Sequence, residues 1–191
     1  MKQVALLGGS FNPPHIGHLL AATYMRAVMG SDEVWLVPSF HHPFGKALEA
    51  FDDRVALCQS MADSVGPWLK VCTEEQNVPG DGRTIDLLEY LLPKFPQVSF
   101  SFVIGSDILA DVPRWKSWAR IQQLVKVVVL YRAGYPAPEA IGPPLAEASS
   151  TAIRQMFERG ELPTKLVPQA TLRCAQERGL FGLKADAAAG R

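Results

Sequence analysis

Residues 4–18 decide the fold class, and they read Val-Ala-Leu-Leu-Gly-Gly-Ser-Phe-Asn-Pro-Pro-His-Ile-Gly-His. A short apolar run, then glycines, then two histidines at the start of an apolar-periodic stretch predict a strand, a loop and the N-terminus of a helix. Glycines let the backbone approach a ligand, and a helix start offers unpaired N–H groups and a partial positive charge. This arrangement suits a polyphosphate, and the histidines add donors aimed at the same ligand.

The two histidines make this segment more specific than an ordinary glycine-rich turn. Such a turn alone is a weak signal, because many α/β domains use glycines simply to turn the chain. A lone histidine is also more often a structural residue than a ligand-binding one. His15 and His18 frame Gly17 beside the Pro13-Pro14 pair. Packing explains that pattern poorly, so we favour a phosphate site.

Short apolar runs alternate with longer helical patterns along the rest of the chain. We expect strands at 4–7, 33–37, 69–73, 99–104 and 125–131. We expect helices at 18–29, 52–64, 84–92 (capped by Thr84 and stopped by Pro93), 115–124, 150–159 and 168–178, and loops at 39–47 and 133–144. This order predicts an α/β fold, a Rossmann-like doubly wound parallel sheet with helices on both faces in an α/β/α arrangement. In such sheets ligands lie outside the carboxyl ends of the strands, where the loop after the first strand begins.

Length and composition limit the class of protein. The chain has 191 residues, 48% of them hydrophobic, which predicts a single domain over 1–183 followed by a flexible tail at 184–191. Its 19 basic and 19 acidic residues balance. That balance argues against a non-specific nucleic-acid binder, which needs a basic surplus for its phosphate contacts. It leaves a homo-oligomer open.

Cysteine use and hydropathy predict a cytoplasmic protein with no membrane contact. Cys58, Cys72 and Cys174 are widely spaced and form no C-x-x-C pair. They indicate neither a zinc site nor a disulfide framework, and reduced thiols are the simplest interpretation. No apolar run approaches the length of a membrane-spanning helix or of a signal-peptide core.

A second motif, Ser-Ser-Thr-Ala-Ile-Arg, occupies residues 149–154. Serine or threonine at a helix start caps the free N–H groups, and Arg154 then follows one turn into the helix. Alone, this segment would be read as an ordinary capped helix with a solvated arginine. Beside the first motif, it predicts a second phosphate-binding helix start.

The two motifs together resemble those of the nucleotidyltransferase superfamily, which carries G-x-F-[DN]-P-x-H-x-G-H and S-S-T-x-I-R. Within it, the chain is most similar to the bacterial nicotinate-nucleotide adenylyltransferases. Further similar segments are Gly-Arg-Thr-Ile-Asp-Leu-Leu at 82–88, Phe-Val-Ile-Gly-Ser-Asp at 102–107 with Trp-Lys-Ser-Trp at 115–118, and Leu-Val-Pro at 166–168 with Gly-Leu-Phe at 179–181. The resemblance covers nearly the whole chain.

The resemblance implies adenylyl transfer from ATP to nicotinate mononucleotide, giving deamido-NAD and pyrophosphate with Mg²⁺ as cofactor. It implies no protein nucleophile, since a phosphate oxygen of the acceptor attacks, and catalysis by alignment and electrostatic stabilisation. Mg²⁺ would be held mainly by phosphates and water, without a cluster of protein ligands.

The resemblance also assigns roles to individual residues. The implied catalytic residues are His15, His18, Lys46 and Arg154. The implied ATP-binding residues are Gly8, Gly9, Ser10, Phe11, His15, Gly17, His18, Gly105, Asp107, Ser149, Ser150, Thr151 and Arg154. The implied acceptor-binding residues are Phe11, Asn12, Lys46, Thr84, Ile85, Trp115 and Arg132, with Trp115 stacked on the nicotinate ring and Trp118 left as the core tryptophan. For Asp107 a helix-capping role, and for Arg132 a surface charge, remain alternatives.

Three departures from the family pattern bear on the acceptor. Asn12 stands where many superfamily members have aspartate, and it can still orient the turn. Residues 41–46 read His-His-Pro-Phe-Gly-Lys where the nicotinate enzymes usually read Pro-Pro-His-Lys, and Arg83 replaces an aromatic residue. Alternative functions are therefore an adenylyltransferase for nicotinamide mononucleotide or phosphopantetheine, or a non-catalytic nucleotide-binding protein.

Overall fold

The computed structural model describes residues 1–40, 48–80 and 82–184. Lys46 therefore lies outside the described residues, as does the predicted tail apart from Lys184. Within the described residues, no helix is long and apolar enough to cross a membrane.

A six-stranded parallel sheet forms the centre of the molecule, in the order β3-β2-β1-β4-β5-β6. The strands are β1 Lys2–Gly9, β2 Glu33–Pro38, β3 Leu69–Val71, β4 Val98–Gly105, β5 Lys126–Arg132 and β6 Ile141–Leu145. The strand order reverses between β1 and β4, which is where doubly wound sheets open a ligand crevice. The predicted fold class is confirmed.

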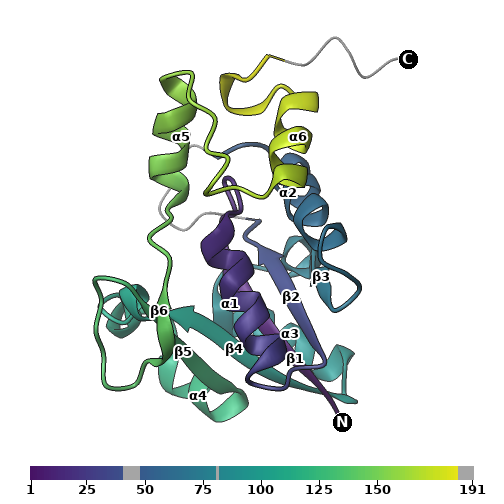
Figure 1. The fold of residues 1–191 in the computed structure, drawn as a ribbon. Coiled ribbons are helices and arrows are strands. Elements are labelled where there is room, and N and C mark those ends of the chain that lie inside the picture. Colours follow the sequence, from purple (N-terminus) through teal and green to yellow (C-terminus); the bar gives the residue numbers. More distant parts are fainter. Residues whose placement is uncertain (41–47, 81, 185–191) are drawn as a thin grey trace.

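Helices cover both faces of the sheet. α1 Ile16–Ala27 and α2 Phe51–Asp63 pack on one face, and α3 Thr84–Lys94 and α4 Trp118–Leu124 pack on the other. α5 Ser150–Glu158 and α6 Gln169–Glu177 stand beyond the carboxyl ends of the strands (Figure 1). Short 3₁₀ turns complete the chain at η1 Glu74–Asn77, η2 Ser106–Ile108, η3 Val112–Arg114 and η4 Leu180–Gly182.

The alternation of β1 divides the core into two layers. Val4 and Leu6 pack with α3 and α4, whereas Ala5 and Leu7 pack with α1 and α2. All four side chains are buried, as expected for a strand covered on both faces. Fully burying a leucine such as Leu6 contributes about 2 kcal/mol. The core thus fixes β1, and with it the start of the glycine-rich loop.

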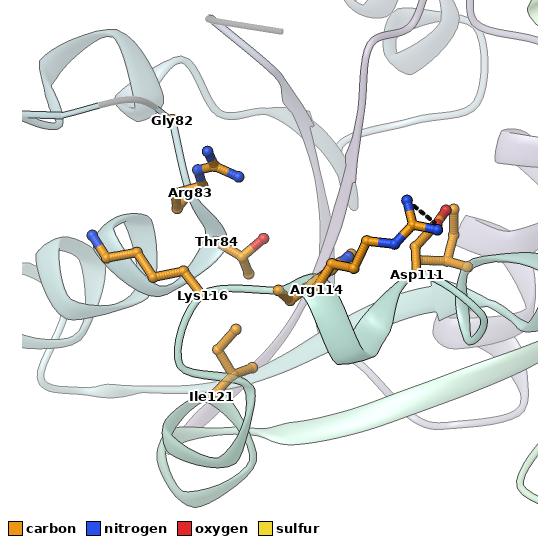
Figure 2. A pocket seen from close by; sticks show the side chains of 9 residues that line it. Gly82, Arg83, Thr84, Asp111, Arg114, Lys116 and Ile121 are labelled. Carbon is orange, nitrogen blue, oxygen red and sulfur yellow. Dashed lines mark ion pairs between the residues drawn. The ribbon is translucent and has the colours of Figure 1, made fainter. Parts of the chain in front are cut away.

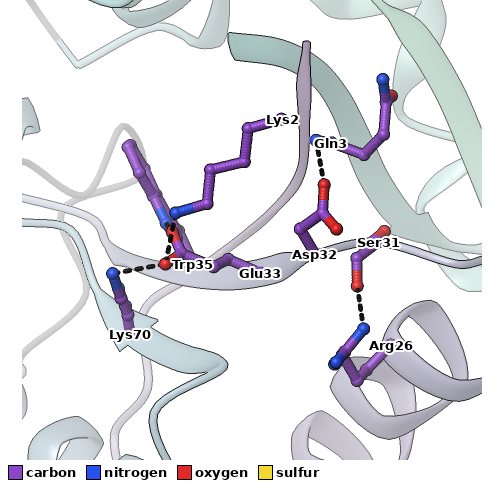
Figure 3. A network of polar contacts seen from close by, with 8 residues as sticks. All are labelled: Lys2, Gln3, Arg26, Ser31, Asp32, Glu33, Trp35 and Lys70. Carbon is purple, nitrogen blue, oxygen red and sulfur yellow. Dashed lines mark hydrogen bonds and ion pairs between the residues drawn. The ribbon is translucent and has the colours of Figure 1, made fainter.

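A polar cluster ties the three strands β1, β2 and β3 together at their amino ends (Figure 3). Glu33 is buried and pairs with Lys2 at 2.7 Å and with Lys70, while Trp35 Nε1 donates to its second oxygen at 2.9 Å. Burial alone would raise the pKa of Glu33, but the hydrogen bonds from these three partners lower it to about 2. The carboxylate is therefore charged at neutral pH. It stabilises the amino ends of these strands, which lie opposite the predicted ligand site at the carboxyl ends.

The structure corrects three of the local predictions. Residues 141–144, the end of the predicted loop at 133–144, form β6 together with Leu145, because a strand with Gly142, Pro143 and Pro144 is tolerated at a sheet edge. Residues 115–117 do not belong to α4, since Ser117 adopts the left-handed region at φ 55° and the helix starts at Trp118.

The third correction concerns α3. Thr84 is its first helical residue, with Arg83 in the cap position and no side-chain cap. The helix also continues through Pro93 to Lys94, because a proline in the last turn removes only a terminal hydrogen bond.

Candidate functional site

The histidines of the glycine-rich loop cap the start of α1 reciprocally. The Gly17 N–H donates to Nδ1 of His15 at 3.2 Å, and the His15 N–H donates to Nδ1 of His18 at 3.1 Å. The two rings lie 3.8 Å apart between centroids. A Cβ at Gly17 would come within 3.1 Å of the His15 ring, so glycine leaves room for this arrangement. The sequence pattern His-x-Gly-His is therefore a geometric requirement of the loop.

Burial sets the protonation state of the two histidines, and these hydrogen bonds set which ring nitrogen carries the proton. Burial, with a smaller effect from Arg132, lowers the pKa of His15 to about 4, and burial with the nearby His15 and Arg132 lowers that of His18 well below its usual range. Both rings are therefore neutral at pH 7. Because each Nδ1 accepts a hydrogen bond, each ring must carry its proton on Nε2. His18 thus presents a neutral N–H donor rather than an imidazolium.

A cavity of about 400 Å³ opens at the carboxyl ends of β1, β4 and β5. His18 lines it, and its volume is that of an ordinary small-molecule site. The cavity extends from α1 across the strand ends to the start of α3. The predicted site residues on its wall are Gly8, Gly9, Ser10, Gly17, His18, Thr84, Gly105, Asp107, Trp115 and Arg132.

Four other predicted residues are buried and absent from this wall: Phe11, Asn12, His15 and Ile85. Phe11 is fully buried, and the centroid of its ring lies 4.7 Å from that of His18, so it packs against the histidine ring. The side chain of Asn12 accepts the Glu49 N–H at 3.1 Å. Phe11, Asn12 and His15 therefore hold the loop in position, Ile85 packs in the core beneath α3, and none of the four forms the cavity surface.

Arg132 and Asp107 face each other at the end of the cavity formed by β4 and β5. Nε of Arg132 lies 3.5 Å from Oδ2 of Asp107, and its Nη2 donates to the Ala148 carbonyl at 2.6 Å. A Cβ at Gly105 would overlap Oδ1 of Asp107, so a larger residue there would force the Asp107 carboxylate to turn away from its present position. Asp107 lies inside the η2 turn and does not act as a side-chain helix cap. Arg132 is half-buried and lines the cavity, which favours a ligand-facing role over a surface charge.

The Ser-Ser-Thr-Ala-Ile-Arg motif docks α5 against the loop after β1. Ser150 Oγ donates to the Pro13 carbonyl at 2.8 Å, and Nη1 of Arg154 donates to the Asn12 carbonyl at 2.7 Å. Ser149 is the helix cap, as predicted, and its Oγ accepts the Ala152 N–H at 3.1 Å. The two motifs, more than 130 residues apart, thus meet at one place.

The α5 motif lies beside the cavity and does not line it. Ser149, Ser150, Thr151 and Arg154 are all absent from its wall. The Arg154 guanidinium uses two of its five N–H groups, one toward Asn12 and one toward Thr151 Oγ1 at 3.4 Å. The remaining donors of the guanidinium are therefore available at the rim next to the histidine loop.

A second cavity of about 230 Å³ adjoins the first, and the two share Gly82, Thr84, Ile108 and Trp115 as walls. Three cationic side chains line it: Arg83 and Lys116 on one side and Arg114 on the other (Figure 2). Lys116 pairs with Asp86 at 2.9 Å, and Arg114 lies 3.8 Å from Asp111. The Trp115 ring packs edge-on against Phe102 and Trp118. Of the two tryptophans, Trp115 alone lines the cavities, as predicted.

Comparisons with known proteins identify the family of this chain. The family model described as cytidylyltransferase-like matches residues 6–156. The chain is 55% identical to "Probable nicotinate-nucleotide adenylyltransferase" of Myxococcus xanthus (strain DK1622), over 95% of this chain and 96% of that relative. The chain belongs to the nicotinate-nucleotide adenylyltransferase family. A relative of the same name from Anaeromyxobacter sp. (strain K) is 44% identical over 94% of this chain and 97% of its own length.

Solved structures of the nicotinic acid mononucleotide adenylyltransferase of Plasmodium falciparum, complexed with NaAD and with APC, share the fold of this family member. Each superposes with a TM-score of 0.79 over 96% of this chain and 99% of that chain, at 17% identity. Identity this low supports the fold alone.

Sequence reasoning missed two charged residues of this nicotinate-nucleotide adenylyltransferase family member: Arg54 and Glu75. Arg54 is buried in the first turn of α2, and Glu75 lines the larger cavity from η1. Arg54 shares the inward face of α2 with Leu57, Cys58 and Met61. A cation on an apolar stripe is a usable signal, because charges are almost never buried without partners. Glu75 carries no comparable signal in the sequence.

Proposed function

We propose that this protein transfers the adenylyl group of ATP to nicotinate mononucleotide, forming deamido-NAD and releasing pyrophosphate. The observation that carries the proposal is the meeting of two capped helix starts, at His15–His18 and Ser149–Arg154, beside one cavity. Helix N-termini attract phosphate groups. Family membership supports the same reaction.

The chemistry requires alignment rather than a protein nucleophile. A phosphate oxygen of the mononucleotide forms a bond to the α-phosphorus of ATP, and the bond between that phosphorus and the bridging oxygen breaks as pyrophosphate leaves. Charge develops on the α-phosphate and on the leaving group. A neutral Nε2–H of His18, already oriented by its Nδ1 hydrogen bond, stabilises that charge without reorganisation. His15 fixes the loop and shares the task through its own Nε2–H.

The remaining phosphate contacts come from two arginines. Arg154, at the rim, holds the β- and γ-phosphates together with the α5 N-terminus, where Thr151 adds a hydroxyl donor. The Ser150 hydroxyl, which donates to the Pro13 carbonyl, holds this helix start against the histidine loop. Arg132, on the cavity wall, holds the mononucleotide phosphate. Backbone N–H groups of Gly8, Gly9 and Ser10 complete the cradle.

The second cavity suits the nicotinate end of the acceptor. Trp115 offers a ring for stacking on the electron-poor pyridinium. The cations of Arg83, Arg114 and Lys116 outnumber the two carboxylates beside them, Asp86 and Asp111, by one charge. The remaining positive charge favours a carboxylate over a carboxamide. Backbone N–H groups at Thr84 and Ile85 add donors suited to a carboxylate.

Mg²⁺ fits this site as a phosphate-bound ion. No group of three or more His, Cys, Asp or Glu side chains that could hold a metal occurs in the described residues, and Asp107 supplies one carboxylate on the cavity wall. Mg²⁺ is commonly held by substrate phosphates, water and one or two carboxylates. When bound, it would neutralise charge on the triphosphate.

An acceptor panel tests the proposed function. Purified protein with ATP and Mg²⁺ should release pyrophosphate faster with nicotinate mononucleotide than with nicotinamide mononucleotide or phosphopantetheine. Equal or faster turnover with the amide or with phosphopantetheine would refute the acceptor assignment. ATP binding without turnover of any acceptor would favour a non-catalytic nucleotide-binding protein.

The cellular setting is part of the same proposal. The three cysteines are free thiols, and Cys58 and Cys72 are buried. Unpaired cysteines are typical of a reducing compartment, which supports a cytoplasmic location.

A further inference from the structure

The Arg54 guanidinium connects three backbone segments around the larger cavity. Its Nη1 donates to the Ser10 carbonyl at 2.9 Å, its Nη2 to the Ser39 carbonyl at 2.8 Å, and its Nε to the Glu49 carbonyl at 3.0 Å. Ser10 follows β1, Ser39 follows β2, and Glu49 precedes α2. The guanidinium therefore spans the loop that carries the histidines and the loop that follows the next strand.

Glu75 holds the same backbone from the other side. Its Oε1 accepts the Phe40 N–H at 3.0 Å. The Ser39 carbonyl and the Phe40 N–H belong to one peptide unit, so Arg54 and Glu75 grip the two polar ends of a single peptide bond. The Ser39 N–H also donates to the Gly9 carbonyl at 2.9 Å, which ties this unit to the end of β1.

This peptide unit forms part of the cavity surface. Ser39, Glu75 and Ser10 all line the larger cavity. η1, which carries Glu75, packs against α3, whose first residue Thr84 lines both cavities. The gripped peptide is thus linked through Glu75 and η1 to the start of α3, where Thr84 lies.

Two buried charges at a cavity for anions call for an explanation: Glu75 lines the cavity, and Arg54 donates to the wall residues Ser10 and Ser39 without lining it itself. Burial raises the pKa of Glu75 to about 7, opposed by the Phe40 N–H and by the Arg54 guanidinium. A carboxylate facing phosphates would repel them, and burying an arginine without need is costly. The hydrogen bonds that these two side chains make within the described residues all go to loop backbone, and we infer that the charges are kept to hold those loops.

We propose that Arg54 and Glu75 are positioning residues that clamp the Ser39–Phe40 peptide and so set the acceptor side of the active site relative to the histidine loop. This inference rests on the proposed function of the same site. Neither side chain needs to contact the reacting phosphates. They affect substrate binding indirectly, by fixing the position of the Ser39–Phe40 peptide in the cavity wall.

The test separates the hydrogen bond of Glu75 from its charge. Glu75→Ala removes the acceptor of the Phe40 N–H, whereas Glu75→Gln keeps an oxygen in its place. Glu75→Ala should raise the KM for nicotinate mononucleotide about tenfold, the size expected for an unsatisfied buried donor, and leave the KM for ATP within about twofold. Glu75→Gln should stay within about threefold of the unmodified protein in both constants.

Glu74→Ala provides the matched control from the same 3₁₀ turn. Glu74 pairs with Lys94 at 2.6 Å and is absent from the cavity wall. Its removal should lower the melting temperature without changing either KM. Arg54→Lys should raise the acceptor KM and lower kcat together, because an ammonium cannot hold three carbonyls in the plane of a guanidinium.

Three results would overturn the inference while leaving the proposed function standing. They are an unchanged acceptor KM in Glu75→Ala, equal increases in both KM values, and a Glu75→Gln variant as impaired as Glu75→Ala. Absence of turnover of nicotinate mononucleotide by the unmodified protein would refute the proposed function, and this inference with it.

Discussion

The backbone N–H of His15 donates to Nδ1 of His18, and this single hydrogen bond determines which ring nitrogen of His18 faces the cavity with a proton. A second hydrogen bond of the same kind runs from the Gly17 backbone N–H to Nδ1 of His15. The side chains that cap the helix are therefore the ones that we propose as phosphate donors. Stability and catalysis are coupled at the start of α1.

Replacing His18 should separate these two roles. His18→Ala removes the Nε2–H donor, and kcat should fall about a hundredfold or more, with a much smaller change in ATP affinity, because the contact strengthens in the transition state. His18→Gln can place an amide N–H near the lost Nε2 and should recover part of kcat. Steady-state kinetics with both substrates measures this. Turnover of His18→Ala at the unmodified rate would contradict the proposed role.

The low pKa values of the histidine pair predict a specific dependence of stability on pH. In the folded protein the pKa of His15 is lowered to about 4 and that of His18 well below its usual range, so both rings stay neutral in mild acid. A histidine in the unfolded chain titrates near 6.5. Between these values the unfolded state binds more protons, so the free energy of unfolding falls as pH drops below about 6.5. Above that pH the contribution of the pair is fully present.

Urea unfolding at pH 5 and pH 7.5 checks this effect. The unmodified protein should lose more stability on acidification than a variant in which His15 and His18 are both glutamine. An equal loss in the two proteins would show that the histidines are not responsible.

The two tryptophans of the 115–118 segment form a natural pair for comparison. Trp115 and Trp118 pack on the same core cluster, but only Trp115 lines the cavities. Trp115→Ala should raise the KM for nicotinate mononucleotide about tenfold through lost stacking, with little change in the KM for ATP. Trp118→Ala should mainly lower the melting temperature. Similar effects of both substitutions on the acceptor KM would favour a purely structural role for Trp115.

The Glu33 cluster, at the amino ends of β1, β2 and β3, predicts a second loss of stability at acid pH. Glu33 titrates near 2 in the folded protein against an ordinary value of 4.5. Its contribution is therefore present above about pH 4.5 and is lost as pH falls toward 2. Glu33→Gln should destabilise the protein by about 1 kcal/mol at pH 7 and by less at pH 3. Glu89→Gln removes an exposed ion pair in which Glu89 lies 3.7 Å from Arg120. This control should leave the free energy of unfolding almost unchanged at either pH.

Much of the fold could be predicted because its local signals are strong. The strands β1 and β5 contain continuous hydrophobic runs, as expected for strands covered on both faces, and β4 ends on the apolar run Phe102–Ile104. β6 could not be predicted, since Ile-Gly-Pro-Pro-Leu lacks every ordinary strand preference and depends on pairing with β5. The start of α4 was misplaced because the left-handed Ser117 carries no sequence signal.

The site was predictable where its residues are contiguous. The residue spacing in the sequence predicts His15, His18 and the 149–154 motif, and the structure brings the two segments together. Arg54 and Glu75 were missed because their partners are backbone groups of loops far away in the chain. Those partners become neighbours only when the sheet forms. The cationic second cavity was likewise hidden, since Arg83 and Arg114 come from separate turns.

The edge strand β6 also bears on how copies of this protein meet one another. Successive residues of a strand direct their N–H groups to opposite edges, so the consecutive Pro143 and Pro144 remove a donor from each side of β6. The outward side therefore offers an incomplete template to a neighbouring chain. Sheet extension across this edge is disfavoured, which protects the exposed flank from the edge-to-edge aggregation to which parallel sheets are prone.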